Sequence, residues 1–149
     1  GIRDEAMQEM VDKVRNEEKA EVVVVISHNG MDVDLKMASV VSGIDVIFGG
    51  HTHDGMPAPS IIKNRGGQTL VTNAGSNGKY LGVMDLDVRG GKVRDFRYRL
   101  LPVFSNLLPA DAEMQAYIDN VRKPYLGQLN EKLATAGELL YRRGNFNGT

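Results

Sequence analysis

Three histidines are the residues of this chain whose type and spacing best suit a chemical role. Two of them follow an apolar segment and a pair of glycines, in the run Val46-Ile47-Phe48-Gly49-Gly50-His51-Thr52-His53-Asp54. The third ends another apolar segment, in the run Val22-Val23-Val24-Val25-Ile26-Ser27-His28. Imidazole is the commonest protein ligand for metal ions, and residues i and i+2 of an extended segment point the same way. His28, His51 and His53 are therefore candidate metal ligands facing one site.

The donor types limit which metal site this chain can complete by itself. Three neutral imidazoles would suit one zinc ion with a position left free for water, whereas two six-coordinate ions would need many more oxygen donors. Four aspartates lie nearby in the sequence, but none has clear ligand spacing: Asp32, Asp34, Asp45 and Asp54. A site completed by residues outside this chain therefore stays open. The chain has no cysteine, which excludes thiolate zinc sites, disulfides and a cysteine nucleophile.

The elements around the histidines explain how they would meet. Residues 22–26 are continuously apolar and β-branched, which predicts a strand buried on both faces of a mostly parallel sheet, and residues 44–48 are expected to form the next buried strand. Between them, Asp32 is expected to cap a helix over 33–42 that Gly43 ends. A strand–helix–strand unit places both strand ends at the same edge of the sheet, and α/β sheets bind ligands outside the carboxyl ends of their strands. His28 and His51 are therefore expected at one site.

Periodicity predicts the other elements: an amphipathic helix over 4–15, strands over 60–63 and 68–74, and a hairpin of strands 81–89 and 92–101 around Gly90-Gly91. Asp111 is then expected to cap a helix that Pro124 kinks and that reaches about residue 135. An apolar stripe along that helix, from Met114 to Leu133, predicts packing in a core or between domains.

The composition of the chain limits the classes of partner that it is expected to bind. The 149 residues are enough for one ordinary domain, the net charge is −1, and no dense basic patch indicates nucleic acid. No apolar run reaches the roughly 18 residues of a membrane span, so we expect neither a nucleic-acid nor a membrane partner. The chain starts at a glycine and stops within a polar pattern, and we expect it to be a piece of a longer protein.

Two motifs resemble those of a known family. Ser27-His28-Asn29-Gly30 and Gly49-Gly50-His51-Thr52-His53-Asp54 are similar to the last two metal motifs of the calcineurin-like metallophosphoesterases, and within them to the 5′-nucleotidase branch. The resemblance continues through Gly78-Lys79-Tyr80-Leu81-Gly82 and the hairpin. It is closer still to the SoxB thiosulfohydrolases of bacterial sulfur oxidation, whose most distinctive counterpart is the closing run Arg142-Arg143-Gly144-Asn145-Phe146-Asn147-Gly148-Thr149.

The resemblance implies a fold and a metal centre. Residues 1–104 would be the C-terminal half of a four-layer αββα metallophosphoesterase sandwich, 105–136 a linker and long helix, and 137–149 the start of a C-terminal 5′-nucleotidase-like domain. Two divalent ions, manganese by resemblance, would be bound, with His28 and His51 on one and His53 on the other. The family's earlier motifs, with the bridging aspartate, an asparagine ligand and the catalytic histidine, are absent, so this chain would hold no catalytic residue.

The resemblance also implies an activity. The intact protein would release sulfate from a cysteine-S-thiosulfonate on the SoxYZ carrier protein in the periplasm, a step of thiosulfate oxidation. Arg142 and Arg143 are candidates to bind the sulfonate oxygens, and Asn73 and Asn77 are weaker candidates to line the site. Two alternatives stay open: a periplasmic 5′-nucleotidase or related phosphoesterase on the same dimetal core, and an inactive isolated fragment that binds metal weakly or not at all.

Overall fold

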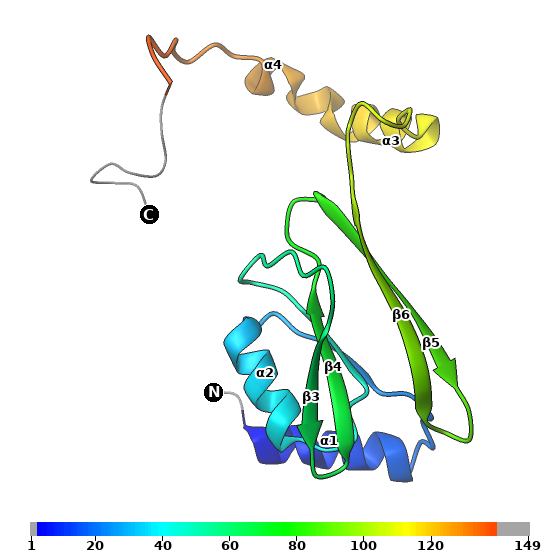
Figure 1. Cartoon of the computed structure of the whole chain (residues 1–149). Helices are drawn as coiled ribbons and strands as arrows, with labels where there is room; N and C mark the ends of the chain where they lie inside the picture. The colour runs from blue at the N-terminus through cyan, green and yellow to red at the C-terminus, as the bar shows by residue number, and fades with distance from the viewer. Residues whose placement is uncertain (1–2, 140–149) are drawn as a thin grey trace. The chain divides into compact units, whose positions relative to one another are not determined.

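The computed structural model describes residues 3–139 of the chain (Figure 1). Its elements are α1 (Asp4–Asn16), β1 (Val24–Ile26), α2 (Met31–Val40), β2 (Val46–Gly49), β3 (Ser60–Asn64), β4 (Gly67–Asn73), β5 (Tyr80–Val88), β6 (Val93–Pro102), α3 (Ala112–Arg122), the short 3-10 helix η1 (Lys123–Tyr125) and α4 (Leu126–Leu129). The chain divides into two compact units, Gly1–Phe104 and Ser105–Thr149, and each is described by itself.

A four-stranded sheet with the order β1-β2-β4-β3 forms the centre of the first unit. The first three of these strands are parallel, with Ile26 opposite Phe48 and Phe48 opposite Thr72, and β3 runs antiparallel to β4. The predicted strand–helix–strand unit is therefore present as β1–α2–β2, and the predicted mixed α/β class is confirmed. The carboxyl ends of β1, β2 and β4 share one edge of the sheet, which brings three separate loops together there.

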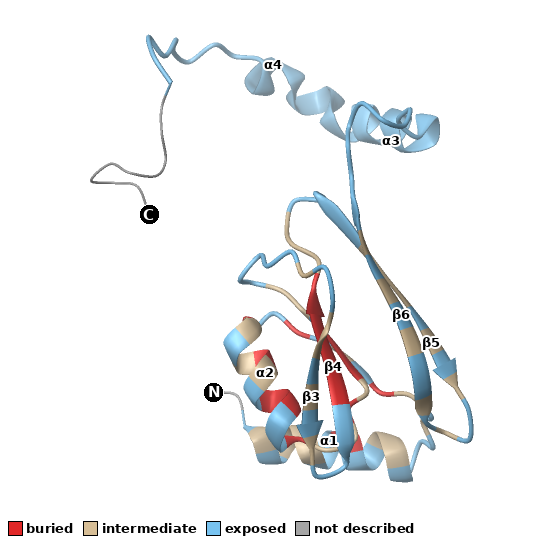
Figure 2. Ribbon diagram, in the orientation of Figure 1, coloured by how far each residue is buried: buried red, intermediate tan, exposed pale blue. Residues whose placement is uncertain are grey.

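The hydrophobic core lies between the two helices and one face of this sheet (Figure 2). Each helix contributes the face on which its apolar residues recur every three to four positions. The buried apolar members of the core are Val11, Val23, Met37, Ala38, Val41, Ile44, Ile47 and Val71. Full burial of one such side chain stabilises a fold by roughly 1.5–3 kcal/mol, so this layer holds the strands that carry the histidines.

The prediction that β1 is buried on both faces is wrong. Val25 is half-buried, but Val24 and Ile26 are 44% and 89% exposed. Side chains of a strand alternate between the two faces of a sheet, and the helices cover only the face to which Val25 points. β1 is also an outer strand of the described sheet. A β-branched apolar run cannot by itself tell one covered face from two.

Helix α2 begins two residues earlier than the sequence predicts. Gly30, with φ = 99°, is its N-cap, and no side chain caps the helix there. Asp32 is therefore not the cap. It lies in the first turn, where the helix dipole favours a negative charge. Asp34, also in the first turn, lies on the side of the helix that faces the sheet, where it is fully buried.

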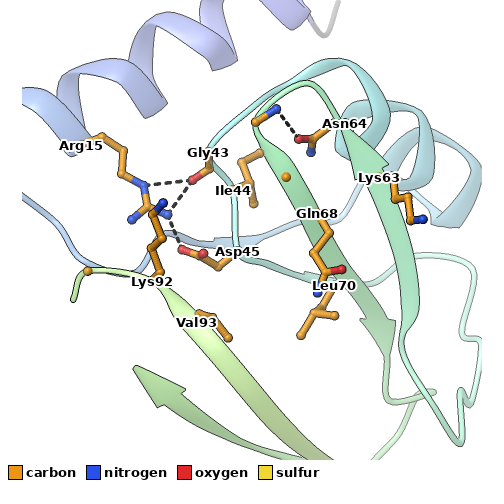
Figure 3. Close-up of a pocket in the computed structure, with 13 residues that line it drawn as sticks. Arg15, Gly43, Ile44, Asp45, Lys63, Asn64, Gln68, Leu70, Lys92 and Val93 are labelled. Atoms are coloured by element: carbon orange, nitrogen blue, oxygen red, sulfur yellow. Dashed lines mark hydrogen bonds and ion pairs between the residues drawn. The ribbon is translucent and has the colours of Figure 1, made fainter. Parts of the chain in front are cut away.

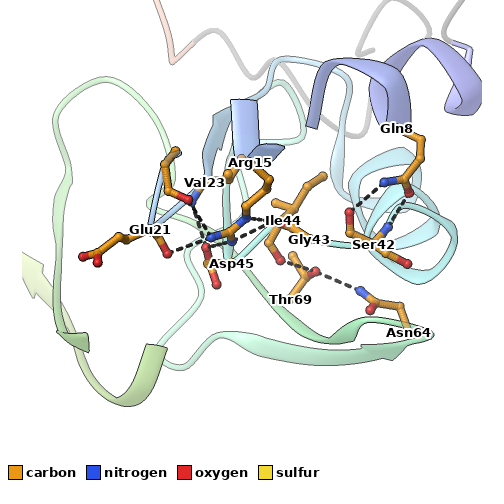
Figure 4. A network of polar contacts seen from close by, with 11 residues as sticks. Gln8, Arg15, Glu21, Val23, Ser42, Gly43, Ile44, Asp45, Asn64 and Thr69 are labelled. Atoms are coloured by element: carbon orange, nitrogen blue, oxygen red, sulfur yellow. Dashed lines mark hydrogen bonds and ion pairs between the residues drawn. The ribbon is translucent and has the colours of Figure 1, made fainter. Parts of the chain in front are cut away.

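One arginine ties α1 to the segments that lead into β1 and β2 (Figure 4). The guanidinium of Arg15 donates to the carbonyl of Gly43 at 2.8 and 3.1 Å and to those of Ala20 and Glu21 at 3.2 and 2.7 Å. It also pairs with the carboxylate of Asp45. A single planar side chain therefore ties the segments before β1 and before β2, which are distant from each other in the sequence, to the end of α1.

Strands β5 and β6 form a separate two-stranded antiparallel sheet, which confirms the predicted hairpin. Gly90 and Gly91 have φ values of 60° and 69°, and the amide of Arg89 donates to the carbonyl of Lys92 at 3.0 Å. Positive φ at both central residues is the geometry of the two-residue turn that suits the twist of paired strands. Only glycine and a few polar residues adopt it at low cost, so the two glycines determine the turn.

The second unit contains α3, η1 and α4. Asp111 caps α3 as predicted, because its Oδ1 accepts from the amide of Met114 at 2.8 Å. Pro124 lies in η1, and the last helix among the described residues ends at Leu129 and not near residue 135. Within this unit, the apolar stripe is exposed along α3, and its packing against another domain stays a prediction. Among the described residues, no helix has both the length and the apolar character that a bilayer crossing needs.

Candidate metal centre

The structure brings two of the three histidines together. His28 and His51 each lie two residues past the end of a strand, and these strands, β1 and β2, are parallel neighbours. Their ring centroids are 5.3 Å apart, and the rings are close to perpendicular, at 71°. Both side chains are exposed. Two accessible imidazoles at this separation fit part of the coordination shell of one divalent ion, with the remaining donors coming from elsewhere.

Each of these imidazoles lies against a glycine from the other motif. A Cβ on Gly50 would come within 3.0 Å of Nδ1 of His28, and a Cβ on Gly30 would lie 3.6 Å from Cδ2 of His51. Gly30 also has φ = 99°, a backbone conformation that other residues adopt only with strain. The glycines thus leave the space in which the two rings approach each other.

The loop after β2 is not extended. His51 and His53 have φ values of 71° and 59°, and the amide of Thr52 donates to the carbonyl of Gly50 at 2.9 Å. The expectation that His51 and His53 point the same way because they alternate along an extended segment is therefore wrong in its premise. Left-handed backbone at non-glycine residues is uncommon and is concentrated at functional sites, so two such histidines in one tight loop support a binding role for it.

Hydrogen bonds hold this loop to the end of β4. The amide of Gly75 donates to the carbonyl of Asp54 at 2.8 Å, and the amide of Met56 donates to that of Asn73 at 3.0 Å. Within residues 3–139, no group of three or more His, Cys, Asp or Glu side chains is placed to hold one metal ion. His53 is exposed, and its assignment to a second ion stays a prediction.

The other predicted site residues fall into three groups. Asn73 is 2% exposed, and its side chain contacts the neighbouring loop: its Nδ2 lies 3.5 Å from the carbonyl of Gly50, and its Oδ1 accepts from the amide of Gly75 at 3.1 Å. This placement supports the backbone of the loop. Asn77 is exposed, with φ = 56°. Arg142 and Arg143 lie outside the described residues, so their proposed contact with substrate stays a prediction.

Two polar residues that the sequence did not single out lie directly behind the histidines. Ser27 is buried and donates its hydroxyl proton to Oδ1 of the fully buried Asp34, with 2.5 Å between the oxygens. The signal for Asp34 was present in the sequence, because an acid there shares a helical stripe with Met37, Ala38 and Val41. A carboxylate on the apolar side of a helix requires a partner in the interior.

A cavity of about 710 Å³ lies at the opposite end of the sheet (Figure 3). It is lined by the segment before β2 and the start of β4, with charged side chains from Arg15, Asp45, Lys63 and Lys92. None of the three histidines lines it. Because open α/β sheets bind ligands outside the carboxyl ends of their strands, the histidine end remains the candidate functional site.

Comparisons with known proteins bear on the fold and the family of this chain. No family model matches the chain. The sulfate thiohydrolase SoxB of Thermus thermophilus is a solved structure that is 35% identical, with a TM-score of 0.76, over 85% of this chain and 22% of its own. A 5′-nucleotidase precursor from Thermus thermophilus shares the fold, with a TM-score of 0.79 and 24% identity over 90% of this chain and 29% of its own.

A curated relative is the trifunctional nucleotide phosphoesterase YfkN of Bacillus subtilis, which is 35% identical over 82 residues, or 55% of this chain and 6% of that protein. The chain thus spans less than a third of each of these three proteins. By their names, all three are hydrolases. The family that the two histidine motifs predicted is confirmed: the chain is a partial chain of the SoxB and 5′-nucleotidase metallophosphoesterases.

Proposed function

We propose that the protein containing this chain is a metal-dependent thiosulfohydrolase, which releases sulfate from a cysteine-S-thiosulfonate on the SoxYZ carrier in the periplasm. The observation that carries the proposal is the likeness to the SoxB structure, at 35% identity across 85% of the chain. Within this chain, His28 and His51 lie side by side at two parallel strand ends, as ligands of one metal ion would need to.

The residues of this chain would supply part of a dimetal centre. His28 and His51 would hold one ion and His53 the other, and donors from other parts of the longer protein would complete both. Divalent ions, for which we propose Mn²⁺, would lower the pKa of a bound water molecule and neutralise negative charge on the oxygens of the substrate. The two rings are already placed together, so little rearrangement of this part of the site is needed for binding.

The reaction is a hydrolysis of a sulfur–sulfur bond. The oxygen of water bonds to the terminal sulfone sulfur, that sulfur separates from its neighbour, and sulfate is released with the oxygen of water. The carrier cysteine keeps the remaining sulfur. Arg142 and Arg143 would bind two sulfonate oxygens in the bidentate manner that a guanidinium favours, and the loop of His51 and His53 would orient the scissile bond.

A 5′-nucleotidase or related phosphoesterase is the second candidate. The fold match to the 5′-nucleotidase precursor, over 90% of the chain, and the 35% identity to the YfkN phosphoesterase favour it. A phosphate ester and a thiosulfonate both present tetrahedral anionic oxygens, so one dimetal core suits either. The difference would then lie in the residues that recognise the rest of the substrate.

For the 149 residues taken alone, we propose that metal binding is weak or absent and that catalysis is absent. Two adjacent imidazoles leave most positions of a six-coordinate ion to other donors, and no three-ligand group occurs within the part of the chain that the structure describes. Ligands and a catalytic base from the rest of the protein would therefore be needed.

The deciding experiment uses the full-length protein loaded with Mn²⁺. Sulfate release from a thiosulfonate-loaded carrier is assayed beside phosphate release from a nucleoside monophosphate. Sulfate without phosphate supports the thiosulfohydrolase, and phosphate without sulfate overturns it in favour of the nucleotidase. A His51→Ala variant that folds but keeps full turnover of either substrate would overturn the assignment of the site.

A further inference from the structure

We propose that Asp34 is a positioning residue for the metal centre, which holds the two strand ends that carry His28 and His51 in register with each other. The inference rests on the proposed function, because it takes these histidines as metal ligands. Asp34 itself lies on α2, behind the strand ends, and its side chain is 0% exposed. Asp34 would act on the metal centre by holding the backbone that carries the two histidine ligands.

The first contact is with the end of β1. Ser27 donates to Oδ1 of Asp34 at 2.5 Å, and the Ser27 hydroxyl in turn accepts from the amide of Asn29 at 3.2 Å. His28 is the residue between these two anchored positions. The amide of Ser27 also donates to the carbonyl of Phe48 at 2.9 Å, which ties this turn to β2. The backbone that presents His28 is therefore held on both sides by a chain of contacts that starts at Asp34.

The second contact is with the end of β2. A Cβ built on Gly49 would lie 2.6 Å from Oδ2 of Asp34, so the carboxylate packs directly on the backbone two residues before His51. Oδ2 has no hydrogen-bond partner among the described residues. The Asp34 side chain thus contacts both strand ends: one carboxylate oxygen accepts a hydrogen bond from Ser27, and the other packs against Gly49.

The charge of the Asp34 carboxylate argues against a role that is limited to filling space in the core. A buried carboxylate is costly, and an apolar side chain on the same stripe as Met37 and Ala38 would fill the space without an unpaired oxygen. A buried polar group can fix a geometry that apolar packing alone leaves free. The outer contacts of metal ligands are known to control affinity by orienting the ligands.

The test measures Mn²⁺ affinity by calorimetry in the full-length protein, together with the visible spectrum of the Co²⁺-loaded form and the thermal midpoint of the metal-free form. Asp34→Ala and Ser27→Ala are each expected to weaken Mn²⁺ binding about 10-fold. The double variant is expected to be no weaker than either single one, because both changes remove the same hydrogen bond. Asp34→Asn keeps an acceptor for Ser27 and is expected to recover most of the affinity and the Co²⁺ spectrum.

The Gly49→Ala variant provides an independent test of the contact between Asp34 and Gly49. Its new Cβ would overlap Oδ2 of Asp34, so the variant is expected to weaken Mn²⁺ binding in the wild-type background. In the Asp34→Ala background the overlap is gone, and the same change is expected to have little further effect. An additive loss in the double variant would contradict the proposed contact.

Thr69→Val is the matched control for stability. Thr69 is also fully buried, and its hydroxyl donates to the carbonyl of Ile44 at 2.7 Å at the opposite end of the sheet. The Thr69→Val variant should lower the thermal midpoint of unfolding and leave Mn²⁺ affinity unchanged. Folded Asp34→Ala and Ser27→Ala variants that bind Mn²⁺ like the wild type would overturn this inference alone. A wild-type protein that binds no Mn²⁺ would overturn the proposed metal centre and this inference with it.

Discussion

Arg15 offers the most direct test of what holds the first unit together. We expect Arg15→Ala to lower the free energy of unfolding by about 2–4 kcal/mol. Its guanidinium makes five hydrogen bonds to Ala20, Glu21, Gly43 and Asp45, and a typical hydrogen bond contributes about 0.5–1.5 kcal/mol net. Because the side chain is 22% exposed, water recovers part of the loss, which places the estimate below the simple total.

The assay is urea unfolding of the chain followed by circular dichroism. The midpoint is expected to fall while the slope with denaturant stays unchanged, because the surface exposed on unfolding is nearly the same. Arg15→Lys keeps the charge but not the planar fork, so we expect an intermediate loss. Arg94→Ala is the matched control, since Arg94 is exposed and makes one hydrogen bond, to the carbonyl of Arg89 at 3.2 Å.

Either of two outcomes would contradict the role assigned to Arg15. Arg15→Ala within about 0.5 kcal/mol of the wild type, the range of ordinary surface substitutions, would show that the five bonds are replaced by water at no cost. A loss of the same size in Arg94→Ala would assign the effect to the removal of charge in general and not to the network around Gly43.

Three further outcomes are expected. Gly90→Ala should lower the stability by about 1 kcal/mol because alanine is strained at φ = 60°, whereas Gly90→Asn should cost less, and thermal unfolding compares the two. Asp111→Ala should destabilise α3 by about 1 kcal/mol, seen as faster hydrogen exchange of the Met114 amide; unchanged exchange would contradict the cap. In the full-length protein, His51→Ala and His53→Ala should each weaken Mn²⁺ binding by calorimetry without changing the fold, because both side chains are exposed; unaltered stoichiometry and affinity in both would exclude them as ligands.

The sequence alone determined the features that depend on local pattern. The parallel pairing of β1 with β2 followed from two largely apolar runs with a helical segment between them, and the hairpin turn followed from Gly90-Gly91. The convergence of His28 and His51 followed from the same argument, since a parallel strand–helix–strand unit leaves both strand ends at one edge. The family also followed, because the two histidine motifs resemble those of the calcineurin-like metallophosphoesterases.

The tertiary structure decided what depends on neighbours distant in the chain. Only one face of β1 is covered, which no run of valines reveals, and α2 begins at Met31 because Gly30 adopts a left-handed conformation against the ring of His51. The contacts of Asp34 were likewise not readable from the sequence, because Ser27 and Gly49 lie at the ends of two different strands. Contacts between strands and helices are set by packing in three dimensions, and a local sequence pattern carries no information about which backbone a buried carboxylate will touch.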